Sequence, residues 1–436
     1  MGDGPSCYIY NDPPLPLFLA AASSSMNSIP VELLCRIFRE CQKADPHAPL
    51  GLSHICKLWR EVAINYSVLW IHIEWENDTL ALDRAHTCVE RAAGQPLDLV
   101  IRYKAAVDKG VLESWIQSKV NKIRSLMLIH LARENGGNLL AAVPTFPLRF
   151  LKRFQILGLE DIELNLAIIA SIITKSPQLT SLQLSGVACL HSPVAFIGVG
   201  GQITHLSIGE HSHIDYMYPL RVDAVLEVLA FCESLRSLEC HSLGEEEGEQ
   251  EPEIIHLSYL TSLTIGDGPE TCRILFYLDT PRLHTLRLSR GKVLDGREME
   301  MDMPTMEVDD DGYPALFINC LEILYCTCKP AITRVIWDHT VVDVSILADC
   351  AAYIPHLSTL TVIGITGLSL DFLSLSTPLP LYSFLRGVEI DRCSIQRSWW
   401  QEMSRLYGPT NMVRRCPLPN IRVFRCDGAS DINLGV

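Results

Sequence analysis

Few residues in this 436-residue sequence have the types and spacing that catalysis or metal binding requires. The Cys-Thr-Cys motif at Cys326–Cys328 could bind a metal or exchange disulfides, but no CxxC pair and no nearby pair of histidines completes a zinc site. The His-Ser-His motif at His211–His213 stands alone, and Asp309–Gly312 lacks the ligand spacing and the terminal glutamate of a calcium loop. The sequence contains no phosphate-binding glycine loop, no nucleophile elbow and no HExxH motif. We therefore expect no catalytic residue, no metal and no cofactor.

The composition is that of a globular protein with reduced cysteines. The chain is 48% hydrophobic and long enough to bury a large core beside a smaller module. Its 16 cysteines lack regular paired spacing, and many fall in hydrophobic segments, which fits buried thiols better than a disulfide framework. We therefore expect a cytoplasmic or nuclear protein.

The N-terminal segment contains an apolar run, LPLFLAAASSS at residues 15–25, that resembles part of a signal peptide. No Lys or Arg precedes the run and prolines interrupt it, so no signal peptide is predicted. Residues 1–27 are expected to be disordered, and Met26 is a hypothetical alternative start. Two further uncharged stretches, 187–208 and 351–370, contain Pro or Gly and several polar residues. Because a span needs about 20 predominantly apolar residues, no transmembrane helix and no membrane partner are predicted.

The net charge of −15 is concentrated in two runs. Gly244–Glu253 carries six acidic residues and no basic one, and Asp295–Asp311 carries eight acidic residues and one arginine. The rest of the chain is nearly neutral, so we expect no nucleic-acid binding through a basic face. The two runs are predicted to be solvated acidic loops. Capture of a basic partner segment is the alternative.

The first elements that could position a function are three helical segments within Ile29–Trp70. Pro30 suits the first turn of a helix, where its missing N–H costs nothing, and Ser28 can cap the free donors. Asp45–Pro49 breaks this helix, a second amphipathic run covers Leu50–Val62, and a short apolar segment ends at Trp70. Apolar residues recur in the first helix at three- and four-residue spacing, at Leu33, Leu34, Ile37, Phe38 and Cys41.

Two explanations fit this helical module. About 45 residues bury little apolar surface by themselves, so a module of this size is marginally stable alone. The first explanation is a helical cap over the end of the domain that follows. The second is a docking module whose exposed apolar residues are covered by a partner. Periodicity alone does not separate the two.

Three blocks of this stretch resemble the F-box in the form common in mushroom-type (basidiomycete) fungi. The blocks are Ile29-Pro30-x-Glu32-Leu33-Leu34-x-x-Ile37-Phe38, then Leu52-Ser53-x-Ile55-Cys56-Lys57-x-Trp59-Arg60-x-Val62-Ala63, and then Leu69-Trp70. Members of that family usually begin with Leu-Pro, so Ile29 is a conservative departure. The resemblance covers residues 28–75, and a helix and strand similar to those that follow the box in the family extend it to residue 105.

The resemblance implies docking on the Skp adaptor of a Skp–cullin–F-box (SCF) ubiquitin ligase. Some residues of the motif must pack internally, and the sequence does not say which. We expect Leu33→Ala or Phe38→Ala to weaken docking by about 2–4 kcal/mol, as for buried interface anchors. The predicted adaptor-binding residues are Ile29, Pro30, Glu32, Leu33, Leu34, Ile37, Phe38, Leu52, Ile55, Cys56, Trp59, Leu69 and Trp70.

A linking segment at 76–117 follows, with a helix predicted over Leu80–Ala93 and ended by Gly94, and a strand over Leu97–Tyr103. Beyond it, the pattern apolar-x-x-apolar-x-apolar recurs. Helix-like runs lie between copies at Ile162–Thr174, Val222–Cys232, Val341–Tyr353 and Ile395–Leu406. A strand and a helix in each unit of about 30 residues are typical of leucine-rich repeats. The eleven copies are Ile123/Leu126/Leu128, Leu151/Phe154/Ile156, Leu179/Leu182/Leu184, Ile203/Leu206/Ile208, Leu235/Leu238/Cys240, Leu260/Leu263/Ile265, Leu283/Leu286/Leu288, Leu321/Leu324/Cys326, Leu357/Leu360/Val362, Leu385/Val388/Ile390 and Ile421/Phe424/Cys426.

The predicted fold class is therefore α/β. A small all-helical F-box is followed, over residues 118–436, by an irregular leucine-rich-repeat-like α/β solenoid with a curved parallel sheet and acidic loops at 244–253 and 295–311. Leucine-rich repeats place Asn or Cys three residues after the last strand leucine, where it ties neighbouring turns together. The first five of these positions hold Leu131, Leu159, Val187, His211 and Leu243, so we expect degenerate repeats. An ordinary α/β domain with hydrophobic strands is the alternative.

Alternation along each strand predicts the side chains of the concave face. This mixed, weakly charged surface suits a folded protein or a peptide better than a polyanion. Candidate substrate-binding residues are Gln155, Gln183, Glu239, Arg287, Tyr325, Glu389 and Arg425. The other predicted face residues are Met127, Ser207, Thr264 and Thr361, with Arg153, His205, Ile323 and Val423 beside them.

The combined prediction is the substrate-recognition subunit of an SCF ubiquitin ligase. Its partners would be the Skp adaptor, through it a cullin, and an unknown protein substrate. Such a subunit is not itself an enzyme, because it acts by raising the effective concentration of the target near the conjugating enzyme. Two alternatives are a non-ligase F-box/Skp scaffold and an enzyme of unrecognised type. Co-purification of a cullin separates the scaffold from the ligase, and a bound cofactor would indicate an enzyme.

Overall fold

The computed structural model divides the chain into two compact units. The helical unit is the chain up to Glu74 together with Leu80–Leu97, and the repeat unit is Trp75–Thr79 together with the chain from Asp98 onward. The predicted linking segment is thus shared between the two. The residues that the structure describes are 29–76, 80–103, 109–130, 148–157, 169–185, 196, 199–209, 220–244, 253–266, 268–289, 312–338, 346, 349–365, 385–393, 420–424 and 426.

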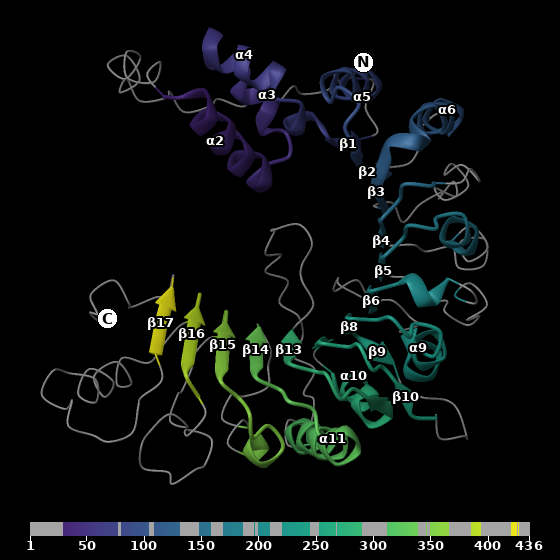
Figure 1. The fold of residues 1–436 in the computed structure, drawn as a ribbon, viewed down its shortest axis with the longest axis vertical. Helices are drawn as coiled ribbons and strands as arrows, with labels where there is room; N and C mark the ends of the chain where they lie inside the picture. The colour runs from purple at the N-terminus through teal and green to yellow at the C-terminus, as the bar shows by residue number, and fades with distance from the viewer. Residues whose placement is uncertain are drawn as a thin grey trace, which may run out of the picture. The chain divides into compact units, whose positions relative to one another are not determined.

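The helical unit consists of short helices with one strand segment (Figure 1). Its first helix begins directly after Pro30, whose carbonyl accepts hydrogen bonds from the N–H groups of Leu33 and Leu34. It ends before Asp45, which is extended. Ser28, the predicted cap, lies outside the described residues. The elements are α2 (Val31–Ala44), α3 (Ala48–Leu52), α4 (Lys57–Asn65), η2 (Ser67–Trp70), β1 (His72–Glu76) and α5 (Ala81–Arg91).

The second amphipathic run differs from the prediction of one helix across Leu50–Val62. It forms α3 and α4 with a turn between them, and α3 already begins within the segment predicted as a break. Cys56 is extended at the start of α4, and its thiol accepts a hydrogen bond from the N–H of Trp59 (3.5 Å). The side chain of Arg60 also donates to the carbonyl of Ser53 (2.9 Å). These two bonds stabilise the turn between the helices. The apolar residues keep a helical spacing on both sides of the turn, so the sequence pattern did not show that the helix is interrupted.

The core of the helical unit is aromatic. The rings of Phe38 and Trp59 lie 5.0 Å apart, and the indole N–H of Trp70 donates to the carbonyl of Ala63 (2.7 Å). The guanidinium of Arg91, at the end of α5, lies 4.4 Å from the centre of the Trp70 ring. The helix predicted over Leu80–Ala93 is present, and the chain leaves it through Gly94 at φ +83°, a conformation that glycine adopts without strain.

The repeat unit is built on one parallel sheet in which each strand lies beside the next copy (Figure 1). This stacking of strand and helix units is an α/β solenoid, as predicted for the coarse fold. From β2 onward, the strands in spatial order are β2 (Leu97–Tyr103), β3 (Ile123–His130), β4 (Arg153–Leu157), β5 (Ser181–Ser185), β6 (His205–Gly209), β8 (Ser237–His241), β11 (Ser262–Gly266), β13 (Thr285–Ser289), β14 (Arg334–Asp338), β15 (Thr359–Ile363), β16 (Gly387–Asp391) and β17 (Asn420–Phe424).

Helices and short strands connect the main strands. The helix predicted over Val222–Cys232 is present as α9, and the described part of Ile162–Thr174, from residue 169, is helical. Val341–Tyr353 is described only in part, where it contains η8, and Ile395–Leu406 lies outside the described residues. The connecting elements are α6 (Lys109–Lys119), η3 (Val120–Lys122), η5 (Gly200–Gln202), α9 (Val222–Leu229), α10 (Pro269–Arg273), η6 (Ile274–Tyr277), α11 (Gly312–Cys328) and η8 (Asp349–Ala352), with two small parallel pairs, β7 (Leu220–Arg221) with β9 (Leu243–Gly244) and β10 (Ile255–His256) with β12 (Leu278–Asp279).

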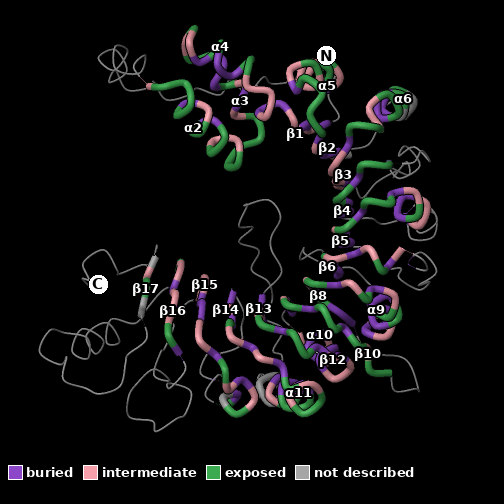
Figure 2. Tube along the Cα trace, viewed as in Figure 1, coloured by how far each residue is buried: buried purple, intermediate pink, exposed green. Residues whose placement is uncertain are grey.

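One face of the sheet packs on the helices and the other carries no described helix. Buried and exposed segments of the chain are coloured in Figure 2. In β4, for example, Phe154 and Ile156 are fully buried, whereas Arg153 is exposed and Gln155 is half-buried. On the covered side, Phe317 of α11 meets Trp337 of β14 edge to face, with ring centres 6.0 Å apart. We call the opposite side of the sheet the open face. It corresponds to the predicted concave face.

Two of the eleven predicted copies are wrong in register. The eighth predicted copy, Leu321/Leu324/Cys326, lies in helix α11. The strand that follows β13 in the sheet is β14, and the buried residues Ile332, just before β14, and Val335 and Trp337 within it form the eighth copy. The spacing i, i+3 is common to this repeat and to a helix, so the pattern alone does not distinguish them. At the last copy, Ile421 and Val423 pair with Val388 and Ile390, which shifts the repeat by three residues from the predicted register.

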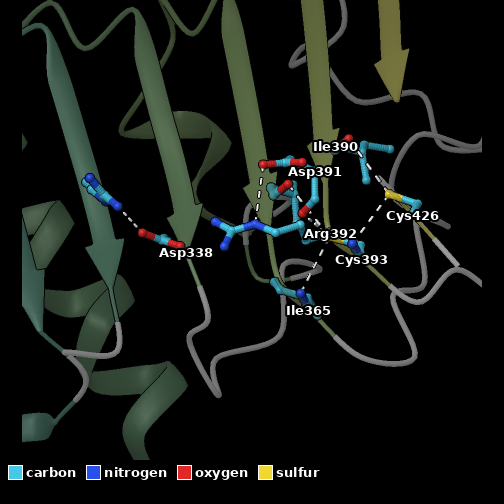
Figure 3. Close-up of polar contacts among 9 residues, drawn as sticks. Asp338, Ile365, Ile390, Asp391, Arg392, Cys393 and Cys426 are labelled. Carbon is cyan, nitrogen blue, oxygen red and sulfur yellow. Dashed lines mark hydrogen bonds and ion pairs between the residues drawn. The ribbon is translucent and has the colours of Figure 1, made fainter. Parts of the chain in front are cut away.

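A sulfur ladder joins the last copies, although the sequence analysis found none in the first five (Figure 3). The thiol of Cys393 accepts a hydrogen bond from the N–H of Ile365 (3.5 Å), and the thiol of Cys426 accepts one from the N–H of Cys393 (3.3 Å). Cys426 in turn donates to the carbonyl of Ile390 (3.8 Å). Each cysteine lies three residues after the last apolar residue of its strand. The ladder residue that the first five copies lack is therefore present in the last two.

Candidate protein-interaction surfaces

Helix α2 presents an apolar strip beside its buried face. Leu34 and Phe38 are fully buried, whereas Leu33 is 51% exposed and Ile37 is 42% exposed. At 3.6 residues per turn, Pro30, Leu33 and Ile37 follow one line along the helix, next to the buried line. We call these three residues the α2 strip. Apolar side chains in this position give a partner a hydrophobic surface on a rigid element.

A second exposed apolar residue of the motif, Ile55, lies in the turn between α3 and α4 and is 55% exposed. It is exposed because the backbone leaves the helix there, while Leu52 before it and Trp59 after it are buried. Val31 and Ile64 are exposed as well and were not predicted. Their positions on the helices would have identified them only after the buried face was known.

The structure thus divides the predicted adaptor-binding residues into two groups. One group forms the core of the helical unit, and these side chains position the α2 strip instead of offering surface. Its members are Leu34, Phe38, Leu52, Trp59, Leu69 and Trp70. The other group is available to a partner: Pro30, Glu32, Leu33, Ile37 and Ile55 are exposed, and Ile29 and Cys56 are half-buried.

The open face of the repeat unit carries one continuous row of residues at the centre of the strands. The pairing register places Gln155, Gln183, Glu239, Arg287 and Glu389 in this row, as predicted from alternation. Tyr325 is not among them, because it lies in α11, and Arg425 lies outside the described residues. The row in order is Met127, Gln155, Gln183, Ser207, Glu239, Thr264, Arg287, Ile336, Thr361, Glu389 and Arg422.

Two of the predicted neighbouring residues also change place. Ile323 lies in α11, and Val423 pairs with Ile390, on the covered side of the sheet. Arg153 and His205 begin their strands on the open face, as predicted, and are exposed. The replacements for the two misplaced row residues, Ile336 and Arg422, follow from the corrected register.

Side chains of the central row contact one another across the strands. The amide of Gln155 donates to the amide oxygen of Gln183 (2.9 Å), and the hydroxyl of Thr361 donates to Glu389 (3.3 Å). Arg334 and Arg422 lie 3.7 Å and 3.9 Å from the carboxylate of Glu389. This part of the open face therefore holds two arginines around a single carboxylate.

Two more ion pairs lie toward the carboxyl ends of the strands. Arg287 pairs with the buried carboxylate of Asp338 on the next strand, and Arg392 lies 3.5 Å from Asp391 (Figure 3). The Arg392–Asp391 pair is partly exposed and contributes little to stability. The Arg287–Asp338 pair is largely buried, so loss of Arg287 would leave the carboxylate of Asp338 buried without this partner. Both arginines already have a carboxylate partner, which lowers their availability to a ligand.

Burial suppresses the ionisation of two of the buried cysteines, Cys232 and Cys350. Burial raises the pKa of the Cys232 thiol to about 12, and burial together with the charge of Asp349 does the same for Cys350. Such thiols are protonated at neutral pH, and the thiolate is the reactive form. The described cysteines form no disulfide with one another.

The weak chemical motifs of the sequence gain no support in the described residues. Cys326–Cys328 is the end of α11, where Cys326 is exposed and the thiol of Cys328 donates to the carbonyl of Leu324 (3.3 Å). No group of three or more His, Cys, Asp or Glu residues suited to a metal occurs in the part of the chain that the structure describes. His211–His213, the three aspartates before Gly312, and most of both acidic runs lie outside it.

A search of the described helices finds none that is both long and apolar enough to cross a membrane.

Comparisons with known proteins return structural likenesses only. No family model matches the sequence, and no curated protein matches it. One solved structure that it resembles is the leucine-rich repeat-containing protein LegL7 from Legionella pneumophila, with 15% identity and a TM-score of 0.35, covering 74% of this chain and 89% of that one. Another is a protein from Bacteroides fragilis, with 12% identity and a TM-score of 0.36, covering 80% and 85%. At these TM-scores we draw no argument from either likeness.

Proposed function

We propose that this chain is the target-recognition subunit of a Skp–cullin–F-box ubiquitin ligase. In this proposal the helical unit docks on the Skp adaptor and the open face of the repeat unit holds a target protein. The chain contributes no catalytic group. It raises the effective concentration of the target near the ubiquitin-charged conjugating enzyme.

The observation that carries the proposal is the α2 strip. Its residues Pro30, Leu33 and Ile37 belong to the first block of the F-box-like motif, and they are the members of that block's apolar set that remain exposed. Two large apolar side chains exposed one turn apart on the same helix form a surface that a partner can cover. Side chains of this size stabilise a complex by about 1.5–3 kcal/mol each when a partner buries them completely.

The test is a pull-down of the full chain with a recombinant Skp adaptor and a cullin. We expect the native chain to recover both, and the variant Leu33→Ala/Ile37→Ala to recover neither. Ile323→Ala is the matched control, because Ile323 is 41% exposed on α11, in the other unit. Recovery of the adaptor without a cullin would favour a non-ligase scaffold. Equal recovery by the native chain and the double variant would refute docking through the α2 strip.

A further inference from the structure

The entry side of the sheet carries charge of one sign. In nine strands, β4–β6, β8, β11 and β13–β16, we consider the residue before the strand and the first residue of the strand. These positions hold Lys, Arg, His, Ser, Thr or Gly, and no acidic residue, although the chain has 51 acidic and 36 basic residues. We call this set the N-terminal rim. Its cations are Lys152, Arg153, Arg236, Arg334 and Arg386, with His205 and His284 between them.

Most of these cations are available to a partner. Lys152, Arg153, Arg236 and Arg386 are exposed and form no ion pair with another described residue. Arg334 is also exposed, but it is paired, because it lies 3.7 Å from the carboxylate of Glu389. The arginines farther along the strands, Arg287, Arg392 and Arg422, also contact a carboxylate. The unpaired cations therefore gather at the entry ends of the strands.

Hydroxyl groups hold the rim in place. The hydroxyl of Thr204 donates to the carbonyl of Thr180 (3.1 Å), that of Thr261 to Arg236 (3.1 Å), and that of Ser358 to Thr333 (3.0 Å). Backbone N–H groups donate to the same carbonyls. The rim is thus a regular edge whose cations are spaced by whole strands, at about 4.8 Å per strand.

The spacing matches an extended peptide. Lys152 and Arg236 each stand directly before the first residue of their strands, and these strands lie three apart, which places the two cations about 14 Å apart. Arg153 and Arg334 are first residues of their strands on the open face, six strands apart. An extended chain rises about 3.3 Å per residue, so acidic side chains about four residues apart would meet Lys152 and Arg236. The histidines fall in the intervals. Strands of nucleic acid carry a phosphate about every 3.4 Å along a duplex, which is far denser than these cations.

Two exposed aromatic rings lie at the same edge, in the turns that enter β4 and β11. Phe150 is 49% exposed and Tyr259 is 51% exposed. The guanidinium of Arg282 lies 5.5 Å from the centre of the Tyr259 ring, a cation–π contact that orients it. Apolar surface between cations suits a peptide, which brings apolar side chains together with its acidic ones.

We propose that the N-terminal rim binds an acidic peptide segment in an extended conformation, across the entry ends of the strands, with Asp or Glu about every fourth residue. An acidic segment of this kind is the class of target that the proposed ligase subunit would hold. Only its role as a ligase target rests on the proposed function; peptide binding at the rim does not. Charge complementarity carries it. A chain with a net charge of −15 that excludes acids from one edge can attract an acidic segment there, because salt screens more distant charges beyond about 10 Å.

The experiment is a fluorescence-anisotropy titration of the full chain with a labelled peptide that has Glu at every fourth position among Ser, Gly and Leu. The control peptide has Gln in place of each Glu. We expect binding of the Glu peptide to weaken as salt rises from about 50 to about 300 mM, and no measurable binding of the Gln peptide. Equal binding of both peptides would overturn the proposal, as would stronger binding of polyuridylate than of the Glu peptide.

Matched variants locate the site. Lys152→Gln/Arg153→Gln/Arg236→Gln removes three unpaired rim cations, and we expect it to weaken the Glu peptide by about tenfold. Arg273→Gln/Arg392→Gln/Arg422→Gln changes the net charge equally, at arginines that already have carboxylate partners, and should leave binding within about twofold. Equal losses in both variants would show that only net charge matters and would refute the rim.

The rim and the ligase proposal fail separately. Adaptor recovery by the rim variant should equal that of the native chain, because the rim lies in the other unit from the α2 strip. Peptide binding without adaptor recovery would refute the proposed function and leave the rim intact. Adaptor recovery without peptide binding would refute the rim and leave the proposed function intact.

Discussion

Ile37 and Phe38 are adjacent in the sequence, yet their replacement by alanine should have different consequences. Phe38 is fully buried and its ring lies 5.0 Å from that of Trp59, so Phe38→Ala removes a core side chain at a cost of about 3–5 kcal/mol. For a small helical unit that loss is enough to unfold it. Ile37→Ala removes a side chain that is 42% exposed, so the unit should remain folded.

The loss in docking can be worked out from the exposed fractions. Burying a whole Leu or Ile side chain is worth about 1.5–3 kcal/mol, and about half of Leu33 and somewhat less of Ile37 remains to be buried by a partner. The double variant Leu33→Ala/Ile37→Ala should therefore lose about 1.5–3 kcal/mol of docking free energy, or about 10- to 150-fold in Kd. This estimate for two residues together is lower than the value of about 2–4 kcal/mol expected from the motif for Leu33→Ala or Phe38→Ala alone, because part of each side chain is already buried within the unit.

The assay pairs calorimetric titration of the Skp adaptor with thermal unfolding followed by far-UV circular dichroism. We expect Leu33→Ala/Ile37→Ala to keep the helical signal and lose affinity, Phe38→Ala to lose both, and Ile323→Ala to lose neither. If Phe38→Ala had the same Tm as the native chain, the packing argument would be refuted. A double variant with native affinity would refute the docking argument.

Three further predictions concern the repeat unit. Gly209→Ala should destabilise the unit by at least about 3 kcal/mol in urea unfolding, because Gly209 has φ +103° and an added Cβ would lie 1.7 Å from the carbonyl oxygen of His241; native stability would refute this. Cys393→Ala should cost about 1–3 kcal/mol, because it leaves a backbone N–H without its acceptor, whereas Cys393→Asn should restore part of the loss; equal losses would argue against the ladder. Stability should fall as pH rises from about 9 toward 12, because the thiols of Cys232 and Cys350, with a pKa of about 12 in the folded state, ionise first in the unfolded chain. Replacing both with alanine should flatten that part of the pH profile of the urea midpoint, and an unchanged profile would contradict the assignment.

The strands were the most predictable part of the fold. At β5, for example, Leu182 and Leu184 alternate with Ser181 and Gln183, and the same arrangement returns in copy after copy. Alternation is a local property, since it follows from the pleat of a single strand. The prediction failed where a second structure explains the same spacing. In α11, Leu321 and Leu324 satisfy the repeat and a helix equally, and the following Lys329 and Pro330 end that helix before the true strand begins.

Pairs of residues far apart in the sequence were less accessible. The cysteine ladder joins Ile365, Cys393 and Cys426. Cys393 stands three residues after Ile390, where the repeat places Asn or Cys, so it is readable from its own copy, whereas Cys426 fits the ladder only in the corrected register of the last strand. The N-terminal rim was missed because Arg153 and Arg236, which are far apart in the sequence, come to lie at the same end of the sheet only after their strands are stacked. A count of charges along the chain shows a nearly neutral body. In the stacked sheet, the unpaired cations lie at the entry ends of the strands, and most of the ion-paired arginines of the open face lie farther along them.

The sequence by itself determined the helical module at the start of the chain, the positions of most strands and the parallel stacked class of the fold. These follow from side-chain periodicity and from backbone preferences of single residues such as Pro30 and Gly94, which act over a few residues. Only the tertiary structure decided which apolar residues of α2 are core and which are surface, because a helix face is buried or exposed according to what packs on it. It also decided which charges share an edge, because the distance between them depends on the register of the strands and not on their separation in the chain.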